Sequence, residues 1–322
     1  MKRVRLFAGV VLAAFATALA AQEYPAKLIR LIVPFPPTGA TDIYARLVAK
    51  ELQATWGQSV VVENRVGATG LIGTELARRA APDGYTLLFT SNSAHILGPL
   101  PREPRPFDPA ADFTPITKLL RYPLYLVVHP SVPARSLKEF IALAKARPGQ
   151  LSYASSGQAG GSHVVTVLFN EVAGIRATHV PYKGTTPAVQ AVMSGECQYL
   201  FNNIGVSQPH VQSGRLRGLA MTGEKRSPVL PEVPTLAEMG LRGMEDAYTW
   251  IGLLAPAAMS PGVSGKLHAE LVRIMRTDEM EKRVAGDGYL TVANTAAQFR
   301  SEIQAEVATW SRVMRAHGIT AE

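Results

Sequence analysis

Two loops carry the residue types best suited to chemistry in this chain. The first reads Pro34-Phe35-Pro36-Pro37-Thr38-Gly39-Ala40-Thr41-Asp42, and the second, about 120 residues later, reads Ser155-Ser156-Gly157-Gln158-Ala159-Gly160-Gly161-Ser162-His163. Each follows a short β-like run and leads into a helical pattern. Unpaired backbone N–H groups and the positive end of a helix then face whatever lies ahead, which favours an anion. Two such loops in two halves of one chain predict a carboxylate held between two lobes.

Within the first loop, Gly39 lets a ligand approach the backbone, and its backbone angles are expected to resist a β-branched side chain. Thr41 or Asp42 is expected to cap the helix, and Phe35 to form an apolar wall. An ordinary strand-to-helix turn is the alternative. Asp42 at a helix start fits a cap and dipole partner better than an acid catalyst. In the second loop, His163 stays open between a cap and a ligand contact.

Other chemistries lack their motifs. Neither the second loop nor 67–73 has the spacing of a dinucleotide site or a P-loop, and 67–73 is interpreted as a tight helix start. No H-E-x-x-H, cysteine–histidine cluster or G-x-S-x-G elbow occurs, so we expect no metal and no cofactor. The enzyme alternative is a hydrolase using Ser162 and His163. Adjacent residues at a helix start point apart, and no orienting acid stands at a recognisable spacing. We therefore predict a binding protein and not an enzyme.

The first 20 residues have the features of an export signal. Lys2, Arg3 and Arg5 form a basic start, Leu6–Leu19 is almost wholly apolar, and Ala18-Leu19-Ala20 fits a small-x-small cleavage site. The apolar run is too short for a comfortable membrane span, although an uncleaved anchor is the alternative. We predict a signal peptide over 1–20, cleavage near Ala20 and a periplasmic mature chain.

Composition narrows the class of partner. The formal net charge of +8 becomes +5 once the three signal-peptide cations are removed, which mildly favours anionic ligands. The basic residues are scattered, so we expect no nucleic acid partner. Cys197 is the single cysteine, and its strand-like surroundings indicate a buried, inert thiol. His129 and His179 also lie in apolar strand contexts and are interpreted as structural residues.

Alternating strand and helix patterns predict an α/β fold. Strands are expected over 28–33, 59–63 and 85–89, with helices over 43–52 and 71–80 between them, a rhythm that implies a parallel sheet covered by helices. A proline-dense stretch over 99–115 indicates an irregular connection. A second α/β block follows.

Helix boundaries in the rest of the chain are well marked. Ser136 and Glu139 have capping-box spacing, as do Thr295 and Gln298 before the last long helix. Thr186 is expected to cap a helix over 188–194, with Pro187 at its first position.

Two long apolar strands suggest crossovers between lobes. We predict a first lobe from residues 21–123 and 247–322 and a second from 124–246, joined by hinge strands near 119–128 and 248–255. Trp250 lies on the second hinge strand, where core packing and a place beside the cleft are both open.

Further ordered motifs carry a family resemblance. They are Asn64-x-x-Gly67-Ala68-x-Gly70, Pro82-Asp83-Gly84-Tyr85-Thr86-Leu87, Phe107-Asp108-Pro109-x-x-Asp112-Phe113-x-Pro115, His179-Val180-Pro181-Tyr182-Lys183-Gly184-x-x-Pro187-Ala188, Lys225-Arg226-Ser227-Pro228 and Pro231-x-Val233-Pro234-Thr235-x-x-Glu238. With the two loops they span essentially the whole mature chain. In these motifs the chain resembles the periplasmic substrate-binding proteins of tripartite tricarboxylate transporters, also called Bug proteins.

The resemblance implies a type II-like Venus-flytrap fold, in which each of two lobes is a sheet flanked by helices. It implies a monomer that binds a small organic carboxylate and delivers it to the permease subunits of a tripartite tricarboxylate transporter, or reports it to a sensor kinase. In the family, backbone amides of the two glycine loops hold a ligand carboxylate, often through water. Carried over, the binding residues are Phe35, Pro36, Thr38, Gly39, Ala40, Thr41, Asp42, Ser91, Asn92, Ser155, Ser156, Gly157, Gln158, Gly160, Ser162, His163, Tyr182, Asn202 and Trp250.

The chain departs from the family pattern at both loops. The family usually has Gly-Gly where this chain has Thr38-Gly39, and Gly followed by Ser or Thr where it has Ala159-Gly160. Each change alters loop freedom or a hydroxyl donor beside the expected carboxylate. The stretch 91–99 matches the pattern as if shifted by one residue.

Overall fold

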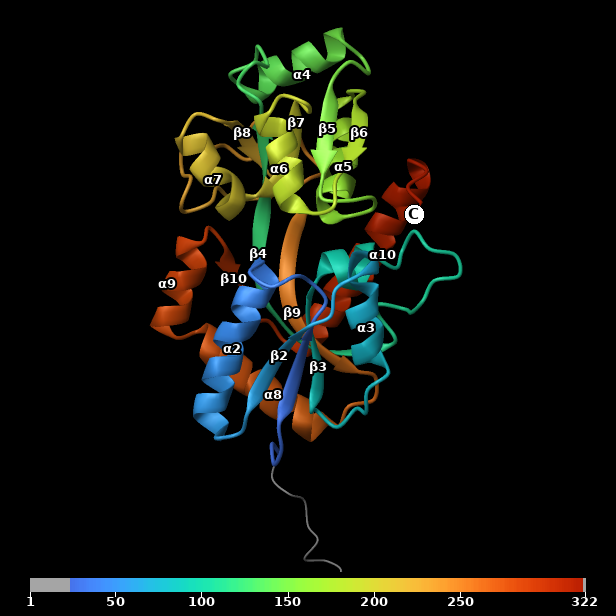
Figure 1. Cartoon of the computed structure of the whole chain (residues 1–322), viewed down its shortest axis with the longest axis vertical. Coiled ribbons are helices and arrows are strands. Elements are labelled where there is room, and N and C mark those ends of the chain that lie inside the picture. The colour runs from blue at the N-terminus through green and yellow to red at the C-terminus, as the bar shows by residue number, and fades with distance from the viewer. Residues whose placement is uncertain (1–23, 321–322) are drawn as a thin grey trace, which may run out of the picture.

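The computed structural model describes residues 24–320 (Figure 1), so the predicted signal peptide lies outside the described residues. None of the helices within 24–320 is both long and apolar enough to span a bilayer. The elements up to the middle of the chain are β1 (Ile29–Val33), α2 (Ala40–Trp56), β2 (Val60–Asn64), η1 (Ala68–Gly70), α3 (Leu71–Arg78), β3 (Thr86–Ser91), η2 (Ser93–Leu97), β4 (Phe113–Val128), α4 (Leu137–Ala146), β5 (Ser152–Ser155) and α5 (Gly161–Ala173). The rest are β6 (Thr178–Pro181), α6 (Thr185–Met193), β7 (Tyr199–Asn203), α7 (Ile204–Gln212), β8 (Arg217–Met221), β9 (Tyr248–Pro256), α8 (Pro261–Met275), α9 (Asp278–Gly286), β10 (Leu290–Thr291) and α10 (Ala296–Ala316).

The strands follow the order β2-β1-β3-β9-β4-β7-β5-β6, with β8 and β10 also paired to β4. In the first lobe, β1 pairs in parallel with both β2 and β3, as the alternating pattern predicted. Strand β9 then pairs antiparallel with β3 and β4. Helices α2, α3, α8 and α10 pack against this sheet. Its core consists of fully buried residues such as Leu31, Leu87 and Leu254.

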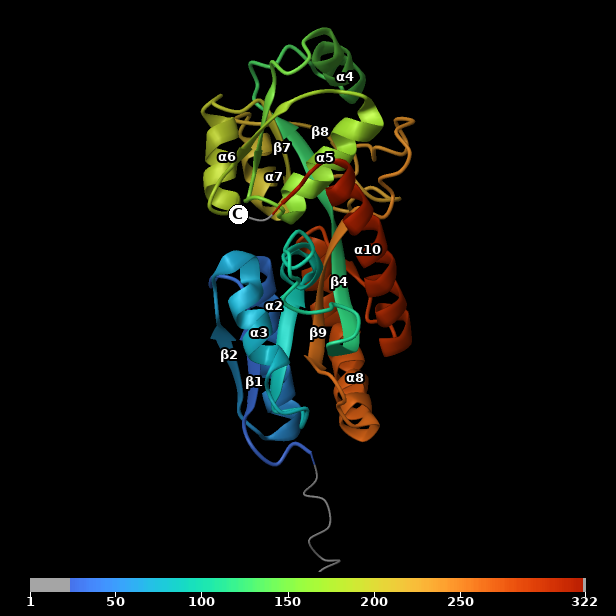
Figure 2. The ribbon, with the colours of Figure 1, turned by 90° about the vertical axis from the view of Figure 1, so that its right-hand side faces the viewer.

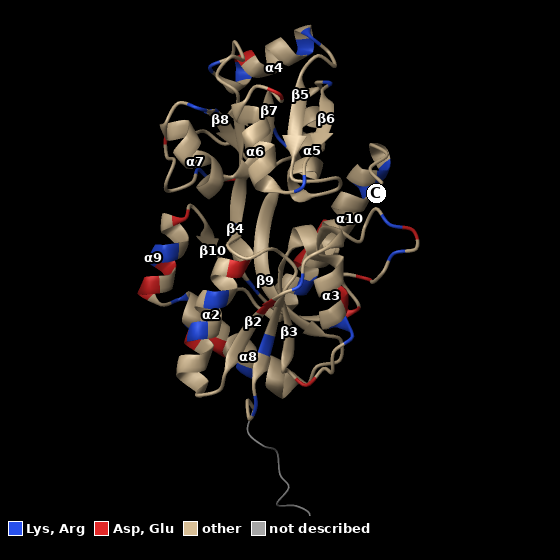
Figure 3. Ribbon diagram, in the orientation of Figure 1, with Lys and Arg blue, Asp and Glu red and all other residues tan. Residues whose placement is uncertain are grey.

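The second lobe is built around the far end of β4. There β4 pairs antiparallel with β7 and β8, while β5 pairs in parallel with β6 and β7. Helices α5, α6 and α7 pack against these strands. The two-lobed α/β class predicted from the sequence is therefore present. Figure 3 shows Lys, Arg, Asp and Glu spread over the helices and loops of both lobes.

Strand β4 joins the two lobes and is 16 residues long. It pairs with β9 from Phe113 to Pro123 and with β7 from Leu124 to Val128, so its partner changes between Pro123 and Leu124. Figure 2 shows β4 and β9 running together toward the upper lobe. Every residue of β9 is buried. The limits of the moving bodies, 21–123 with 247–322 and 124–246, stay a prediction.

Helix starts agree with the sequence patterns at two of three marked positions. The Thr295–Gln298 capping box is complete, and the Ser136 hydroxyl accepts a hydrogen bond from the Glu139 N–H at 3.3 Å. The prediction that Thr186 caps a helix is wrong, because α6 begins at Thr185 behind Gly184. Gly184 has φ +111°, an angle that favours glycine, and it turns the chain into the helix earlier than the Thr-Pro pair indicated.

Candidate functional site

The first loop places a glycine directly before helix α2. Gly39 is the N-cap residue in extended backbone (φ −75°, ψ 163°) and offers no capping side chain. Thr38 before it is left-handed, with φ +70°, and its N–H donates to Asp42 Oδ2 at 3.0 Å. The prediction that Thr41 or Asp42 caps the helix is therefore wrong. Asp42 lies in the first turn and reaches back to fix the loop.

Asp42 is fully engaged by its neighbours. Its carboxylate accepts two hydrogen bonds from Arg46, at 2.9 and 3.0 Å, and one from Asn64 Nδ2 at 2.9 Å. The same Asn64 amide donates to the Phe35 carbonyl at 3.0 Å. Burial works to raise the pKa of Asp42, but the hydrogen bonds from Arg46, Asn64 and Thr38 outweigh it and hold the pKa below its ordinary value. Asp42 is thus an ionised brace for the first loop.

The second loop repeats this arrangement at helix α5. Its N-cap is Gly160 in extended backbone (φ −70°, ψ 165°), again without a capping side chain. Ala159 is left-handed, with φ +55°, and its N–H donates to His163 Nδ1 at 3.0 Å. In both loops the residue before the glycine cap is held by a side chain four residues later. Of the three residues that depart from the family pattern, Thr38 and Ala159 occupy left-handed positions, whereas Gly160 is in extended backbone.

Two helix starts without capping side chains leave their first-turn amides available. The N–H groups of an N-terminal turn have no partner within the helix, and a side-chain cap usually satisfies one of them. Here the available amides belong to Ala40 and Thr41 of α2 and to Gly161 and Ser162 of α5. The expectation that the backbone angles of Gly39 resist a side chain is wrong, because φ −75° is ordinary and a Cβ atom would meet only the Pro36 carbonyl, at 3.7 Å.

Serine hydroxyls of the second loop hold the loop itself. Ser162 Oγ accepts from the Ser156 N–H and bonds the Ser156 hydroxyl, both at 2.9 Å. Ser155 Oγ lies 2.7 Å from His179 Nε2, accepts from the Gly157 N–H at 3.3 Å and lies 3.1 Å from the Gly157 carbonyl. These bonds fix the direction in which the α5 amides point.

Two histidines stack beside the second loop. The ring centroids of His163 and His179 lie 3.7 Å apart, with an angle of 7° between the ring planes, and the Tyr153 ring stacks on His179 with its centroid 4.9 Å away. Burial lowers the pKa of His163 to about 3, with the adjacent His179 adding to the shift, and lowers the pKa of His179 to about 4. Both rings are therefore neutral near pH 7. His163 braces the loop through Ala159, and no Ser162–His163 pair is arranged as nucleophile and base.

The second loop reaches the first lobe beside the end of β3, at the sheet edge where the first loop also lies. Because β1 and β3 are parallel neighbours, the first loop and the Ser91–Asn92 pair leave the same edge of the sheet. A Cβ atom at Gly161 would lie 3.0 Å from Ser93 Oγ and 4.0 Å from Thr249 Oγ1, so α5 of the second lobe starts against η2 and β9. Asn92, directly before η2, is 3% exposed.

The remaining predicted residues are placed less directly. The Tyr182 N–H donates to the Ser155 carbonyl at 3.0 Å, and Asn202 Nδ2 donates to Ser207 Oγ at 3.3 Å, both in the second lobe. The Tyr182 hydroxyl lies 3.6 Å from the buried Cys197 thiol. Trp250 is 1% exposed, and its indole N–H donates to Glu306 Oε1 at 2.7 Å. The buried position favours core packing for Trp250.

The last helix touches the second lobe near this junction. Gln158 Nε2 donates to the Thr320 carbonyl at 3.4 Å, and His317 Nε2 lies 2.8 Å from Glu171 Oε2 of α5. Sequence reasoning placed Asn64 in a motif without giving it a role, and it did not identify Glu306 or the contacts of His317 and Thr320. The spacing of Phe299, Ile303, Glu306 and Trp310 could have shown an acidic residue beside the buried stripe of α10.

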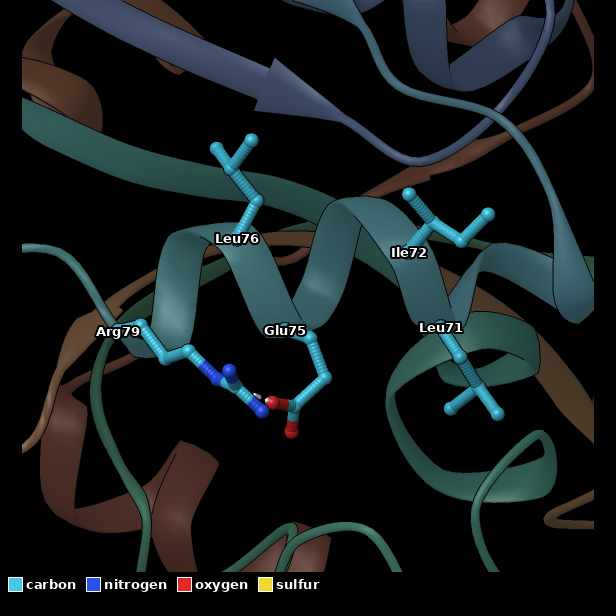
Figure 4. A pocket seen from close by; sticks show the side chains of 5 residues that line it. All are labelled: Leu71, Ile72, Glu75, Leu76 and Arg79. Atoms are coloured by element: carbon cyan, nitrogen blue, oxygen red, sulfur yellow. Dashed lines mark hydrogen bonds and ion pairs between the residues drawn. The ribbon is translucent and has the colours of Figure 1, made fainter.

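A separate hollow lies on the surface of the first lobe beside α3. Leu71, Ile72 and Leu76 supply its apolar lining, and the side chains of Glu75 and Arg79 also line it (Figure 4). Glu75 is paired with Arg78 at 2.8 Å and with Arg79 at 2.9 Å. None of the predicted site residues lines this hollow. Over residues 24–320, no group of three or more metal-ligating side chains occurs.

Comparisons with known proteins agree with this architecture. A family model described as "Tripartite tricarboxylate transporter family receptor" matches residues 44–319. Protein BugT of Bordetella pertussis is 36% identical over 96% of this chain and 95% of its own length. R. palustris Rpa4515, solved with adipate, is 32% identical with a TM-score of 0.84 over 92% of this chain and 99% of that one.

A second solved structure extends the comparison. MatC from Rhodopseudomonas palustris, with bound malate, is 29% identical with a TM-score of 0.79, over 90% of this chain and 99% of that one. The family-model match runs through both lobes and the second loop. The chain therefore belongs to the tripartite tricarboxylate transporter receptor family, the family of periplasmic solute-binding proteins that includes the Bug proteins.

Proposed function

We propose that this protein captures a small organic carboxylate between its lobes and delivers it to the permease subunits of a tripartite tricarboxylate transporter. The observation that carries the proposal is the pair of glycine-capped helix starts at Gly39 and Gly160, which leave first-turn amides available on both sides of the lobe junction. The adipate- and malate-bound relatives support a carboxylate as the ligand class.

The proposed site recognises the carboxylate through the main chain. The N–H groups of Ala40, Thr41, Gly161 and Ser162 act as donors, and the two helix dipoles add favourable potential. Asp42 and His163 keep these donors in place and do not touch the ligand. We propose that the walls of the site come from Phe35, Pro36, Ser91, Asn92, Tyr182 and Asn202, with Trp250 behind Asn92.

Closure of the lobes would complete the site. In our proposal, residues 21–123 and 247–322 move as one body and 124–246 as the other, and β4 and β9 bend where they pass between the two. A sensor role would use the same site. Catalysis is not part of the proposal, because Ser162 Oγ and His163 Nδ1 bond the second loop and not each other.

A thermal-shift screen tests the proposal. The mature protein is heated with mono-, di- and tricarboxylates, amino acids and aromatic acids, and with neutral sugars as the control. A ligand at about 100 times its dissociation constant adds about 2.7 kcal/mol to the free energy of unfolding. For a chain of this size, that raises the melting temperature by about 5 °C. No shift with any acid, or shifts with neutral sugars alone, would refute carboxylate binding. Uptake of the identified acid by vesicles carrying the permease subunits tests delivery.

A further inference from the structure

A polar cluster lies behind the junction and joins four elements of the first lobe. Glu306 of α10 accepts hydrogen bonds from Trp250 Nε1 of β9 at 2.7 Å and from Asn92 Nδ2, beside η2, at 3.3 Å. Lys118 of β4 has its ammonium 3.9 Å from Glu306 Oε1 and 2.7 Å from Glu302 Oε2. The carboxylate of Glu306 thus holds the amide of Asn92 from the side of α10.

The orientation of the Asn92 amide is fixed by its two acceptors. Nδ2 donates to the Tyr248 carbonyl at 3.0 Å as well as to Glu306 Oε2. The Tyr248 carbonyl can only accept, and so can the Glu306 carboxylate when it is ionised, so a flipped amide would place Oδ1 against the Tyr248 carbonyl oxygen. The carbonyl oxygen, Oδ1, therefore faces away from β9 and α10.

Asn92 Oδ1 is a buried acceptor without a partner. Asn92 is 3% exposed, and among residues 24–320 no group donates a hydrogen bond to Oδ1. A buried acceptor left unpaired costs free energy, and such a group in a folded protein calls for a specific explanation. Asn92 follows β3, the strand next to β1, which leads into the first loop. It directly precedes Ser93, whose Oγ would lie 3.0 Å from a Cβ atom at Gly161 of the second loop. A donor on a ligand held at this place is the partner that Oδ1 lacks.

We propose that Asn92 Oδ1 selects carboxylates that also carry a hydrogen-bond donor, a hydroxyl or an ammonium group, and that Glu306 is the positioning residue that keeps Oδ1 turned toward the ligand. This inference rests on the proposed function. The helix-start amides are donors and suit the carboxylate, whereas Oδ1 can only accept and suits a donor beside it. An unsubstituted acid leaves Oδ1 unpaired, and a site with an unpaired polar group rejects such an analogue.

Calorimetry with matched acids tests the selection on the mature wild-type protein. The matched acids are taken from the class that gives the largest thermal shift, and each unsubstituted acid is compared with its donor-bearing analogues. Succinate is compared with malate and aspartate, propane-1,2,3-tricarboxylate with citrate, or phenylacetate with mandelate. Burial raises the pKa of Glu306 to about 7, against the opposing charge of Lys118, so the titrations are run at about pH 8.5, where the carboxylate is ionised. We expect a donor-bearing acid to bind at least about tenfold more tightly than its partner. Malate and aspartate separate a hydroxyl from an ammonium donor.

Three variants assign the effect to residues. Asn92→Leu should remove the preference, so that the donor-bearing acid and its unsubstituted partner bind this variant with equal affinity. In Glu306→Gln, the side-chain NH2 group must face a donor of either Asn92 or Trp250, and two donors repel each other. The Asn92 amide is then held less firmly, so the preference for donor-bearing acids should fall several-fold. Glu302→Gln is the matched control, one turn earlier on α10 and paired with Lys118 but not with Asn92, and it should keep the wild-type preference. Circular dichroism checks the fold of each variant.

The outcomes separate the two proposals. If no acid binds the wild-type protein, the proposed function fails and the selection fails with it. If acids bind with equal affinity within the matched pairs, the selection alone fails. A preference that survives in Asn92→Leu would show that Oδ1 is not the acceptor. A preference unchanged in Glu306→Gln, or equally reduced in Glu302→Gln, would remove Glu306 from the positioning role.

Discussion

Thr38→Gly should stabilise the protein although it deletes a side chain. Thr38 has φ +70°, and a left-handed backbone costs an L-residue about 1–2 kcal/mol, with β-branched residues resisting it most. Glycine adopts this angle freely but loses about 0.4–1 kcal/mol more chain entropy on folding. The Thr38 side chain is exposed, so little packing is lost, and glycine keeps the N–H that donates to Asp42. The net gain is about 1 kcal/mol.

Two further glycine variants calibrate that figure. Ala258→Gly relieves a left-handed angle of φ +65° at an exposed position after β9 and should give a similar gain. Ala159→Gly relieves φ +55°, but its methyl group is 3% exposed, and losing a buried methyl costs about 0.8 kcal/mol. The gain at Ala159 should therefore be close to zero.

Urea unfolding followed by circular dichroism and by tryptophan fluorescence measures these differences, and coincident transitions justify a two-state analysis. A gain of about 1 kcal/mol corresponds to roughly 2 °C in melting temperature. A loss of stability in Thr38→Gly, together with a gain in Ala258→Gly, would show that the first loop holds Thr38 without strain and that the reasoning is wrong.

Three other changes probe the site and its surroundings. Gly39→Val should fold normally, because its Cβ atom would meet only the Pro36 carbonyl, but it should weaken carboxylate binding more than tenfold by obstructing the α2 amides. Thr41→Ser, in contrast, should retain the wild-type affinity. Equal calorimetric affinities for Gly39→Val and wild type would exclude the first loop from the site. Cys197→Ser should cost about 1 kcal/mol in urea unfolding, since burial keeps the thiol in a packing role, and should leave binding unchanged; a tenfold loss of affinity in a folded variant would contradict this. Folding lowers the pKa values of His163 and His179 to about 3 and 4. As the pH falls below about 6.5, these histidines therefore bind protons in the unfolded chain but not in the folded one. The free energy of unfolding should consequently decrease toward acid pH. His163→Asn keeps an acceptor for the Ala159 N–H and should flatten that slope in urea titrations at a series of pH values; an unchanged slope would remove His163 from the effect.

Strand β4 shows where sequence reasoning about the fold reached its limit. The apolar run from 119 to 128 predicted the part that crosses between lobes, but the strand begins at Phe113, inside the stretch taken for an irregular connection. A proline such as Pro115 is usually found at the end of a strand or outside strands, because proline has no N–H to donate. Here the register with β9 shifts between Pro115 and Thr117, and this irregularity lets the strand continue through the proline.

The candidate site was also only partly predictable from the sequence. The glycine and hydroxyl content of the two loops was visible in sequence, but the cap residues were not, because Thr and Asp are the usual caps and both follow Gly39. The bonds that fix the loops come from residues far away in sequence, such as Asn64 on β2 and His179 on β6. Tertiary packing alone brings them to the loops, and no local pattern encodes it.

The contacts of α10 with the second lobe have a practical consequence for handling the protein. The helix packs on β4 of the first lobe, while Thr320 and His317 beyond it bond Gln158 and Glu171 of the second. A purification tag or fluorescent fusion at the C-terminus would emerge beside the second loop, whereas the described N-terminal end emerges at the opposite end of the first lobe (Figure 1). Affinity measurements therefore call for an N-terminal or removable tag. An environment-sensitive dye on the C-terminal segment would, in turn, report lobe movement optically.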